Sequence, residues 1–505
     1  MEADIQISKS RSEHIDTLVN PEFSLCTVEI MSEAATTTSP SGTFHGTVLQ
    51  NGQTAYRGIQ FARAQRWQHP TDIETYGSPV DATSNGSISP QIPGFLEQML
   101  GTDPSSMAEE CLNLNVYCPK GVTDTSSLPV LFWIHGGAYT NGAGSIAWYD
   151  GSRLASRGVV VVAINYRLGA LGFAGTENYG VLDMLSGLRW VQRNISSFGG
   201  NPGNVTIFGE SAGGSAVVSL MATNAANHLF HKAWSMSPSI GQLRDKPRAE
   251  ELLDEYLGLL DAESLNDASE ISIDAVLEAQ AKAAISPSKG FDIFAPTSGG
   301  TSIATDLLQA AANCSIPFVV GTNKDENKLW SAFDQDAATA SQSDWEKFTK
   351  AQFGSTAEKA RSVYEKFRPN EAARELMSAV NTDTGFRQRA QALSEQRCSA
   401  GTPTWMYWFT WETPAFGGIL GSCHAIDIPF AFDNLDAPGA EMLLGDGPER
   451  QGISDRFASE LVQFATHGHP SWEQFNVETR PTLVIGQDIE LVNDPESEIR
   501  QLFGR

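Results

Sequence analysis

The chain contains 505 residues, of which 41% are hydrophobic, so it can bury a large core as two domains or as one α/β domain with insertions. Its formal net charge of −26 argues against nucleic acid and anionic membranes as partners, because both are negatively charged themselves. We attribute this charge to solubility. The sequence has no run of about 18 apolar residues, so it predicts no membrane span.

The N-terminal stretch, residues 1–40, is polar and lacks the apolar core of a signal peptide. Its Ser, Thr and Ala content predicts a disordered tail. We expect residues 41–505 to form one domain in the cytoplasm, where the six cysteines would stay reduced. The cysteine spacings match no zinc or redox motif.

The first half of the chain alternates between predicted strands and helices. Residues 42–61 predict an antiparallel hairpin that turns at Asn51-Gly52. The apolar runs 128–134 and 158–166 are typical of central strands covered on both faces, and 111–118 alternates as a further strand. Residues 95–100 predict a short helix over the site, and 182–195 has helical periodicity.

The second half adds strands at 316–322 and 404–411 and an amphipathic helix at 454–466. Two helical insertions, at about 244–290 and 335–400, predict a cap. The alternation of strands and helices favours an α/β fold with a mostly parallel, doubly wound sheet and helices on both faces.

The motif Gly209-Glu-Ser-Ala-Gly213 lies between an apolar strand, 205–208, and a helix that includes 215–221. In this context Gly-x-Ser-x-Gly is typical of a nucleophile elbow, which predicts Ser211 as a nucleophile. We expect a Cβ at either flanking glycine to collide with the neighbouring strand or helix. The N–H of Ala212 and the positive end of the helix would face an oxyanion.

A serine nucleophile needs a base, and the base needs an acid that orients it. In proteins whose serine lies on a nucleophile elbow, the acid and then the histidine follow the serine along the chain. His467 and His469 end a surface helix, whereas His424 lies in a glycine-rich loop after a strand, so we predict His424 as the base. Asp325 and Glu326 both follow the 316–322 strand, and spacing does not choose between them.

The stretch His135-Gly-Gly-Ala138 follows the predicted strand 128–134. Glycine-rich elements of this kind supply backbone donors to the oxyanion in esterases and lipases. A plain glycine-rich loop would show the same composition. Two such elements in one chain, each after a buried strand, favour the catalytic interpretation.

Together these motifs resemble the type-B carboxylesterases, the cholinesterase-like branch of the α/β-hydrolases. The likeness runs from about Gly42 to the end of the chain. The stretches that carry it are Tyr56-Arg-Gly-Ile-Gln-Phe-Ala62, Glu109-Glu-Cys-Leu-Asn-Leu-Asn115, Trp133-Ile-His-Gly-Gly-Ala138, Asn165-Tyr-Arg-Leu-Gly169, Phe198-Gly-Gly-Asn-Pro202, Gly209-Glu-Ser-Ala-Gly-Gly214, Val320-Gly-Thr-Asn-Lys-Asp-Glu326 and His424.

The resemblance implies roles for particular residues. It makes Glu326 the acid and places Glu210 near the base, where its charge favours the imidazolium. It implies an oxyanion hole and two supporting positions; the hole consists of Gly137, Ala138 and Ala212, and the supporting residues are Ser237 and Asp427. The family's usual disulfide partner is replaced by Ser89, which implies that Cys111 is unpaired, and Glu110 stands where the family has Asp.

The resemblance therefore implies a serine esterase that needs no metal or organic cofactor and acts on small to medium neutral esters. Five residues that flank the catalytic loops are candidates for the substrate pocket, although each also suits plain core or cap packing: Phe95, Met99, Tyr139, Trp330 and Phe333. The alternatives are another acyl hydrolase, such as a lipase, a carbamate hydrolase or a toxin esterase, or a non-catalytic binding module. The presence of all three triad residues argues against the last.

Overall fold

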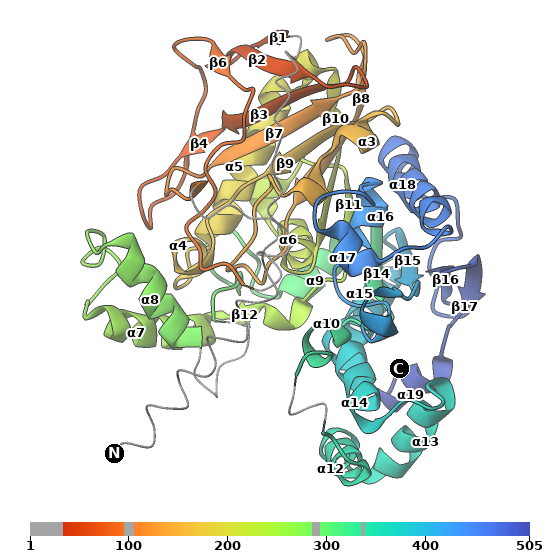
Figure 1. Cartoon of the computed structure of the whole chain (residues 1–505). Coiled ribbons are helices and arrows are strands. Elements are labelled where there is room, and N and C mark those ends of the chain that lie inside the picture. Colours follow the sequence, from red (N-terminus) through yellow and green to blue (C-terminus); the bar gives the residue numbers. More distant parts are fainter. Residues whose placement is uncertain (1–33, 95–105, 285–292, 335–338) are drawn as a thin grey trace, which may run out of the picture. The chain divides into compact units, whose positions relative to one another are not determined.

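The computed structural model describes residues 34–94, 106–284, 293–334 and 339–505. A 13-stranded sheet runs in the order β1-β2-β3-β7-β9-β8-β10-β11-β14-β15-β16-β17, with β6 paired to β2 (Figure 1). Neighbouring strands are parallel from β9 to β16, and the pairs outside this central part are antiparallel except for β2 with β6.

The strands of this sheet are β1 (Ala34–Ser39), β2 (Gly42–Val48), β3 (Thr54–Gln60), β6 (Val80–Asp81), β7 (Asn113–Cys118), β8 (Leu128–Ile134), β9 (Val160–Ile164), β10 (Gly200–Glu210), β11 (Lys232–Met236), β14 (Phe318–Asn323), β15 (Thr404–Phe409), β16 (Pro481–Ile485) and β17 (Ile489–Asn493). Two small sheets pair β4 (Ala62–Arg63) with β5 (Thr71–Asp72) and β12 (Arg244–Asp245) with β13 (Thr297–Ser298). The predicted mostly parallel sheet is confirmed.

The main helices are α3 (Ser152–Ala155), α4 (Gly169–Phe173), α5 (Tyr179–Asn194), α6 (Ala212–Met221), α7 (Lys246–Leu260), α8 (Ile273–Ala284), α9 (Leu307–Asn313), α10 (Lys328–Ser331), α12 (Gln342–Phe353), α13 (Ala357–Phe367), α14 (Ala373–Thr382), α15 (Gln388–Ser399), α16 (Ile428–Phe432), α17 (Ala440–Leu444), α18 (Arg450–His467) and α19 (Ser497–Leu502). The short segments η5 (Ile240–Gln242) and η7 (Asp383–Arg387) lie close to the site described below, and η7 is a π-helix.

Hydrophobic packing covers both faces of the sheet because successive side chains of a strand point to opposite faces. In β8, Phe132 and Ile134 join the apolar cluster that contains Leu185 of α5 and Val217 of α6. Trp133, between them, joins a second cluster with Phe457 and other residues of α18. Strand β8 is buried from its second residue onward, as expected for a parallel strand between two helical layers.

The two predicted insertions pack differently from each other. Tyr256 of α7 and Val276 of α8 belong to the same large apolar cluster as the sheet. The second insertion has a separate small core, in which Trp345 and Leu376 pack with Ile499 of α19. Its last helix, α15, belongs with the sheet instead, because Leu393 lies in the large cluster.

The structure corrects the N-terminal boundary of the sequence prediction. Residues 34–39, which composition assigns to a disordered tail, form β1 and pair antiparallel with β2. Ser/Thr-rich composition is misleading here because backbone pairing with β2 satisfies the N–H and C=O groups of this segment. The strands β11, β16 and β17 also escaped prediction, and the helix expected at 95–100 lies outside the described residues.

Candidate active site

Ser211 lies between the last residue of β10 and the first residue of α6. Its φ of 59° and ψ of −121° are unfavourable for a residue with a side chain. Two backbone hydrogen bonds hold this conformation: the Ser211 N–H donates to the carbonyl of Met236 at 3.0 Å, and the Ser211 carbonyl accepts from Ser215 at 2.9 Å. The strained turn therefore presents a half-buried serine side chain at the carboxyl end of the strand.

The two flanking glycines are required by close backbone contacts, as predicted. A Cβ at Gly209 would lie 2.6 Å from the carbonyl oxygens of Gly213 and Ile134. A Cβ at Gly213 would lie 2.1 Å from the oxygen of Ile134. Both distances are far below van der Waals contact, so β8, β10 and α6 approach this closely only without side chains at these positions.

His424 follows β15 and is buried, with 3% of its surface exposed. Its Nδ1 lies 2.6 Å from Oε2 of Glu326, and its Nε2 lies 3.2 Å from Oε1 of Glu210. Because Glu210 directly precedes Ser211, the Nε2 side of the imidazole faces the end of β10. The structure thus brings Glu210, Glu326 and His424, which are widely separated in the sequence, to one edge of the sheet.

Glu326 and Asp325, which spacing could not separate, have different partners. Glu326 is fully buried, and its Oε1 accepts from the backbone N–H of Asn323 at 2.7 Å while Oε2 faces His424. Asp325 instead accepts from the N–H of Ser422 at 3.1 Å and pairs with Lys328 at 3.2 Å. Of the two carboxylates, Glu326 is the one in contact with the imidazole.

The carboxylates around the imidazole perturb one another. Burial lowers the pKa of His424, but the charges of Glu210 and Glu326 outweigh it and raise that pKa to about 9. Burial, with the nearby charges of Asp427 and Glu326, raises the pKa of Glu210 to about 8. Burial and the charge of Glu326 also raise the pKa of Asp427 to about 7. The cluster therefore favours a protonated imidazole and resists full ionisation of its carboxyl groups.

The predicted oxyanion loop has three successive residues with positive φ: 105° at Gly137, 53° at Ala138 and 62° at Tyr139. The Gly137 carbonyl accepts from the N–H groups of Thr140 and Asn141, both at 2.9 Å. Within the described part of the chain, the N–H groups of Gly137 and Ala138 donate to no protein acceptor. Both residues are partly exposed, so these donors are accessible to a ligand.

This loop packs directly on the elbow. A Cβ at Gly136 would lie 2.8 Å from the carbonyl oxygen of Glu210 and 3.2 Å from Cβ of Ser211. Ala212, the third predicted donor, is the first residue of α6, where helix N–H groups point outward along the axis. The loop thus contacts the backbone that carries Ser211, and Ala212 directly follows the serine.

The two supporting positions are also buried beside these residues. Asp427 accepts from the hydroxyl of Tyr407 at 3.1 Å and from Nδ2 of Asn323 at 3.3 Å. Ser237 has a φ of 42° and donates its N–H to the carbonyl of Gly321 at 2.8 Å. The sequence analysis assigned no role to Tyr407 or Asn323. Tyr407 lies in a predicted aromatic strand, and Asn323 lies directly after the predicted strand 316–322.

The five candidate pocket residues differ in their exposure and in their contacts. Trp330 is 43% exposed, and its ring centroid lies 5.0 Å from that of His424. Phe333 is 49% exposed and contacts Phe416. Tyr139 is fully buried, and its ring centroid lies 5.0 Å from that of Phe173, which favours the core packing that the sequence also allowed. Phe95 and Met99 lie outside the described residues.

Sequence reasoning missed one aromatic residue next to the imidazole. Phe386 lies in η7, and its ring centroid is 5.0 Å from that of His424. It is nearly parallel to Trp330, with an angle of 7° between the rings and 6.3 Å between their centroids. The signal was hidden because helical periodicity assigned this whole region to a cap.

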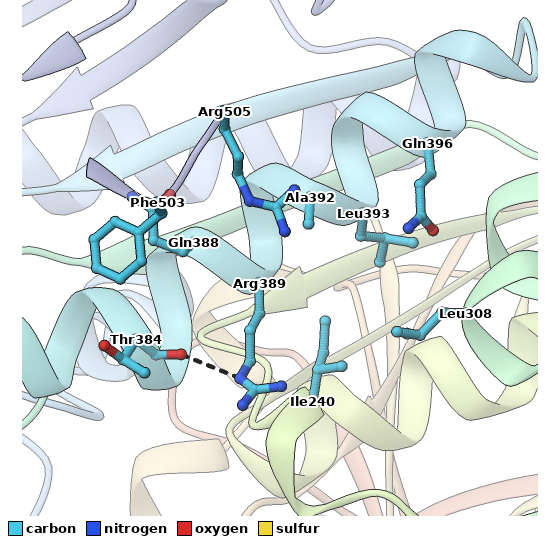
Figure 2. A pocket seen from close by; sticks show the side chains of 10 residues that line it. All are labelled: Ile240, Leu308, Thr384, Gln388, Arg389, Ala392, Leu393, Gln396, Phe503 and Arg505. Atoms are coloured by element: carbon cyan, nitrogen blue, oxygen red, sulfur yellow. Dashed lines mark hydrogen bonds between the residues drawn. The ribbon is translucent and has the colours of Figure 1, made fainter. Parts of the chain in front are cut away.

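A cavity of about 320 Å³ lies close by but contains no predicted triad residue (Figure 2). Figure 2 shows Arg389 hydrogen-bonded to the carbonyl of Thr384 within it. Its lining consists of Ile240, Leu308, Thr384, Gln388, Arg389, Ala392, Leu393, Gln396, Phe503 and Arg505. We therefore do not assign it to the ester-binding site.

In the described ranges, no three His, Cys, Asp or Glu side chains form a group able to hold a metal ion. The same ranges contain no helix of the length and apolarity that a membrane crossing needs. Cys111 is a free thiol, in agreement with the sequence prediction, as are the other four cysteines of the described part.

The twisted parallel sheet, the strained serine turn and the histidine loop define the class of α/β-hydrolases. The profile of the Carboxylesterase family matches residues 32–498. The chain belongs to this family, the type-B, cholinesterase-like carboxylesterases, and is a carboxylic-ester hydrolase.

The chain is similar to the para-nitrobenzyl esterase of Bacillus subtilis, with 35% identity over 92% of this chain and 97% of that protein. It is 31% identical to the fumonisin B1 esterase of Sphingopyxis macrogoltabida, over 82% of this chain and 79% of that protein. Among solved structures, a thermophilic para-nitrobenzyl esterase matches with a TM-score of 0.80 and 32% identity, over 92% of this chain and 99% of the other. The EST55 carboxylesterase of Geobacillus stearothermophilus matches with a TM-score of 0.80 and 28% identity, with the same coverage.

We predict that Gly213→Ala abolishes ester hydrolysis, because its Cβ would force α6 away from Ile134 and displace the serine turn. Gly258→Ala is the matched control: it lies in α7 with no atom within 4 Å of the added Cβ, so activity should be unchanged. Hydrolysis of a p-nitrophenyl ester and thermal melting would be measured for both. Wild-type turnover by Gly213→Ala would contradict the steric argument.

We further predict a pH effect for Glu210→Gln. The base must be neutral to accept a proton, so kcat/KM falls as the pH drops through the pKa of His424. Removing the Glu210 carboxylate takes away a cause of the raised pKa, so the acidic limb should move about one unit or more toward lower pH. The measurement is kcat/KM from pH 5 to 10, with Asp436→Asn, an exposed carboxylate, as control. An unmoved limb would exclude electrostatic coupling between the two groups.

Proposed function

We propose that Ser211, His424 and Glu326 are the nucleophile, base and acid of a two-step ester hydrolase. The single observation that carries this proposal is the imidazole of His424, which is bonded through Nδ1 to Glu326 while Nε2 faces the residue that precedes Ser211. Glu326 fixes the tautomer in which Nδ1 carries hydrogen, leaving the lone pair of Nε2 free to accept the serine proton.

In the first step, Oγ of Ser211 attacks the ester carbonyl as Nε2 of His424 takes the hydroxyl proton. The N–H groups of Gly137, Ala138 and Ala212 stabilise the tetrahedral oxyanion, each contributing about 3 kcal/mol. The imidazolium then protonates the departing alcohol. Water, deprotonated by His424, attacks the acyl-enzyme and releases the acid and the free serine. The chemistry requires no metal or organic cofactor.

We propose small to medium neutral esters as substrates, including esters of aromatic alcohols. Trp330 and Phe386 flank the imidazole with their rings, and exposed aromatic rings pair favourably with aromatic groups. The carboxylates around His424 disfavour negatively charged substrates electrostatically. The name of the relative para-nitrobenzyl esterase supports the same substrate class.

We also propose a reducing compartment, the cytoplasm, as its location. The support is the free thiol of Cys111 together with the serine that replaces its usual partner at position 89.

The proposal is tested by Ser211→Ala. This variant should lose hydrolysis of p-nitrophenyl acetate and labelling by a fluorophosphonate probe, while its melting temperature stays close to that of the wild type, because only a half-buried hydroxyl is removed. Ser196→Ala, at an exposed serine, is the control. Labelling or turnover retained by Ser211→Ala would refute the assignment.

The substrate class is tested by Trp330→Ala. We expect kcat/KM for a benzyl ester to fall about five-fold relative to kcat/KM for the matching ethyl ester, since aromatic pairing contributes about 1 kcal/mol. Leu491→Ala, an exposed apolar residue of β17, should change neither value. Equal losses on both esters would argue that Trp330 does not recognise the alcohol group.

A further inference from the structure

The π-helix η7 joins α14 to α15 and carries Phe386 against His424. Wide turns of this kind are rare and occur frequently at functional sites. The position of Phe386 relative to the imidazole depends on how firmly η7 is held. The residues that hold η7 therefore bear on the geometry of the ester-binding side of the site.

One end of η7 is fixed by buried ion pairs with the C-terminal segment. Arg387, the last residue of η7, places Nη1 2.7 Å from Oε2 of Glu496 and donates from Nη2 to the carbonyl of Pro495 at 2.7 Å. Arg368 places Nη1 2.6 Å from the other oxygen, Oε1, of the same carboxylate. The three charged side chains are between 4% and 11% exposed, so water screens them little.

The guanidinium of Arg387 is also held from the side of the sheet. Its Cζ lies 3.9 Å from the ring centroid of Trp408, in the strand that leads to the His424 loop. At the other end of η7, Asp383 accepts from the hydroxyl of Tyr364 at 2.8 Å. Arg387 thus contacts Glu496 on one side and Trp408 on the other, and it directly follows Phe386, the residue that packs against the imidazole of His424.

The backbone at Glu496 is itself unusual. Its φ of 54° and ψ of 44° are left-handed, a conformation that favours glycine or asparagine. Burial raises the pKa of its carboxyl group, but the charges of Arg387 and Arg368 outweigh burial, and the net shift is downward. The glutamate therefore stays ionised at a position whose backbone disfavours it, and its two arginine partners account for that choice.

We infer that Glu496 is a positioning residue for the active site: through Arg387 it holds η7 so that Phe386 stays packed against His424. This inference rests on the proposed function, because it concerns the base of that reaction. Loss of the carboxylate would leave Arg387 with Asp383, whose Oδ1 lies 3.9 Å from Nη1, as its remaining acidic partner. Two guanidinium groups would then lose their shortest ion pairs in a buried site, and we expect them to move toward water. Arg387 would carry η7 with it, and the ring of Phe386 would leave the imidazole.

The test is a double-mutant cycle with Glu496→Gln, Phe386→Ala and both together, measured as kcat/KM for a benzyl ester. We expect Glu496→Gln to lower kcat/KM about ten-fold in the wild-type background and less than about two-fold when Phe386 is already Ala. A merely structural role would lower the melting temperature in both backgrounds and give the same kinetic loss in both. Equal losses would overturn the inference.

Asp494→Asn is the matched control. Asp494 lies in the same segment and pairs with Arg500 at 2.7 Å, with no bond to η7. This variant should lose a comparable carboxylate–arginine ion pair. We expect it to leave kcat/KM unchanged, both when Phe386 is present and when it is replaced by Ala. A loss of kcat/KM that depends on Phe386 in Asp494→Asn would also overturn the inference, since it would assign the effect to the segment as a whole.

If Glu496→Gln does not fold, Glu496→Asp replaces it in the cycle, because it keeps the charge but is too short to bridge both arginines. Failure of the proposed function gives a distinct result. In that case the wild-type protein would show no hydrolysis dependent on Ser211. Failure of the present inference would leave that hydrolysis intact and make the two losses independent.

Discussion

A single imidazole lies between two buried carboxylates, and the arrangement of the rest of the chain serves this contact. Glu326 bonds to Nδ1 of His424 at 2.6 Å, and Glu210 lies 3.2 Å from Nε2. Buried charges are costly unless they are paired, so the three groups stabilise one another only while each stays in place. Because every partner comes from a different element, the fold must deliver all of them to one point.

The parallel sheet provides this delivery. The strands β8, β10, β14 and β15 all run in the same direction, so their carboxyl ends meet at one edge. The loop that contains Gly137 and Ala138 follows β8, Ser211 follows β10, Glu326 follows β14 and His424 follows β15. Helix α6 approaches the end of β8 so closely that a Cβ at Gly213 would lie 2.1 Å from the oxygen of Ile134. Close backbone packing around Ser211 and ion pairing around His424 therefore act at the same edge of the sheet.

The two aromatic residues beside the imidazole lie on helices and not on strands of the sheet. Trp330 lies on α10, directly after Glu326, whereas Phe386 comes from the π-helix η7 within the second insertion. Both rings lie 5.0 Å from the ring of His424. The insertion has its own small apolar core, shared with α19, and buried ion pairs to Glu496. One of the two rings beside the imidazole thus comes from a helix directly after Glu326, and the other comes from an insertion that is remote in sequence from the serine, glutamate and histidine motifs.

The sequence by itself determined the strands β7, β8, β9, β10, β14 and β15, the serine turn and the histidine, because each depends on local signals: apolar runs, obligatory glycines and a polar residue after a strand. It left Asp325 and Glu326 undecided, and only the tertiary structure showed that one faces the imidazole while the other bonds to Ser422 and Lys328. It left Tyr139 open between the pocket and the core, where this residue packs against Phe173, and it missed Phe386 and the strands β1, β11, β16 and β17. These features depend on contacts with residues that are remote in sequence, and periodicity along the chain does not indicate such contacts.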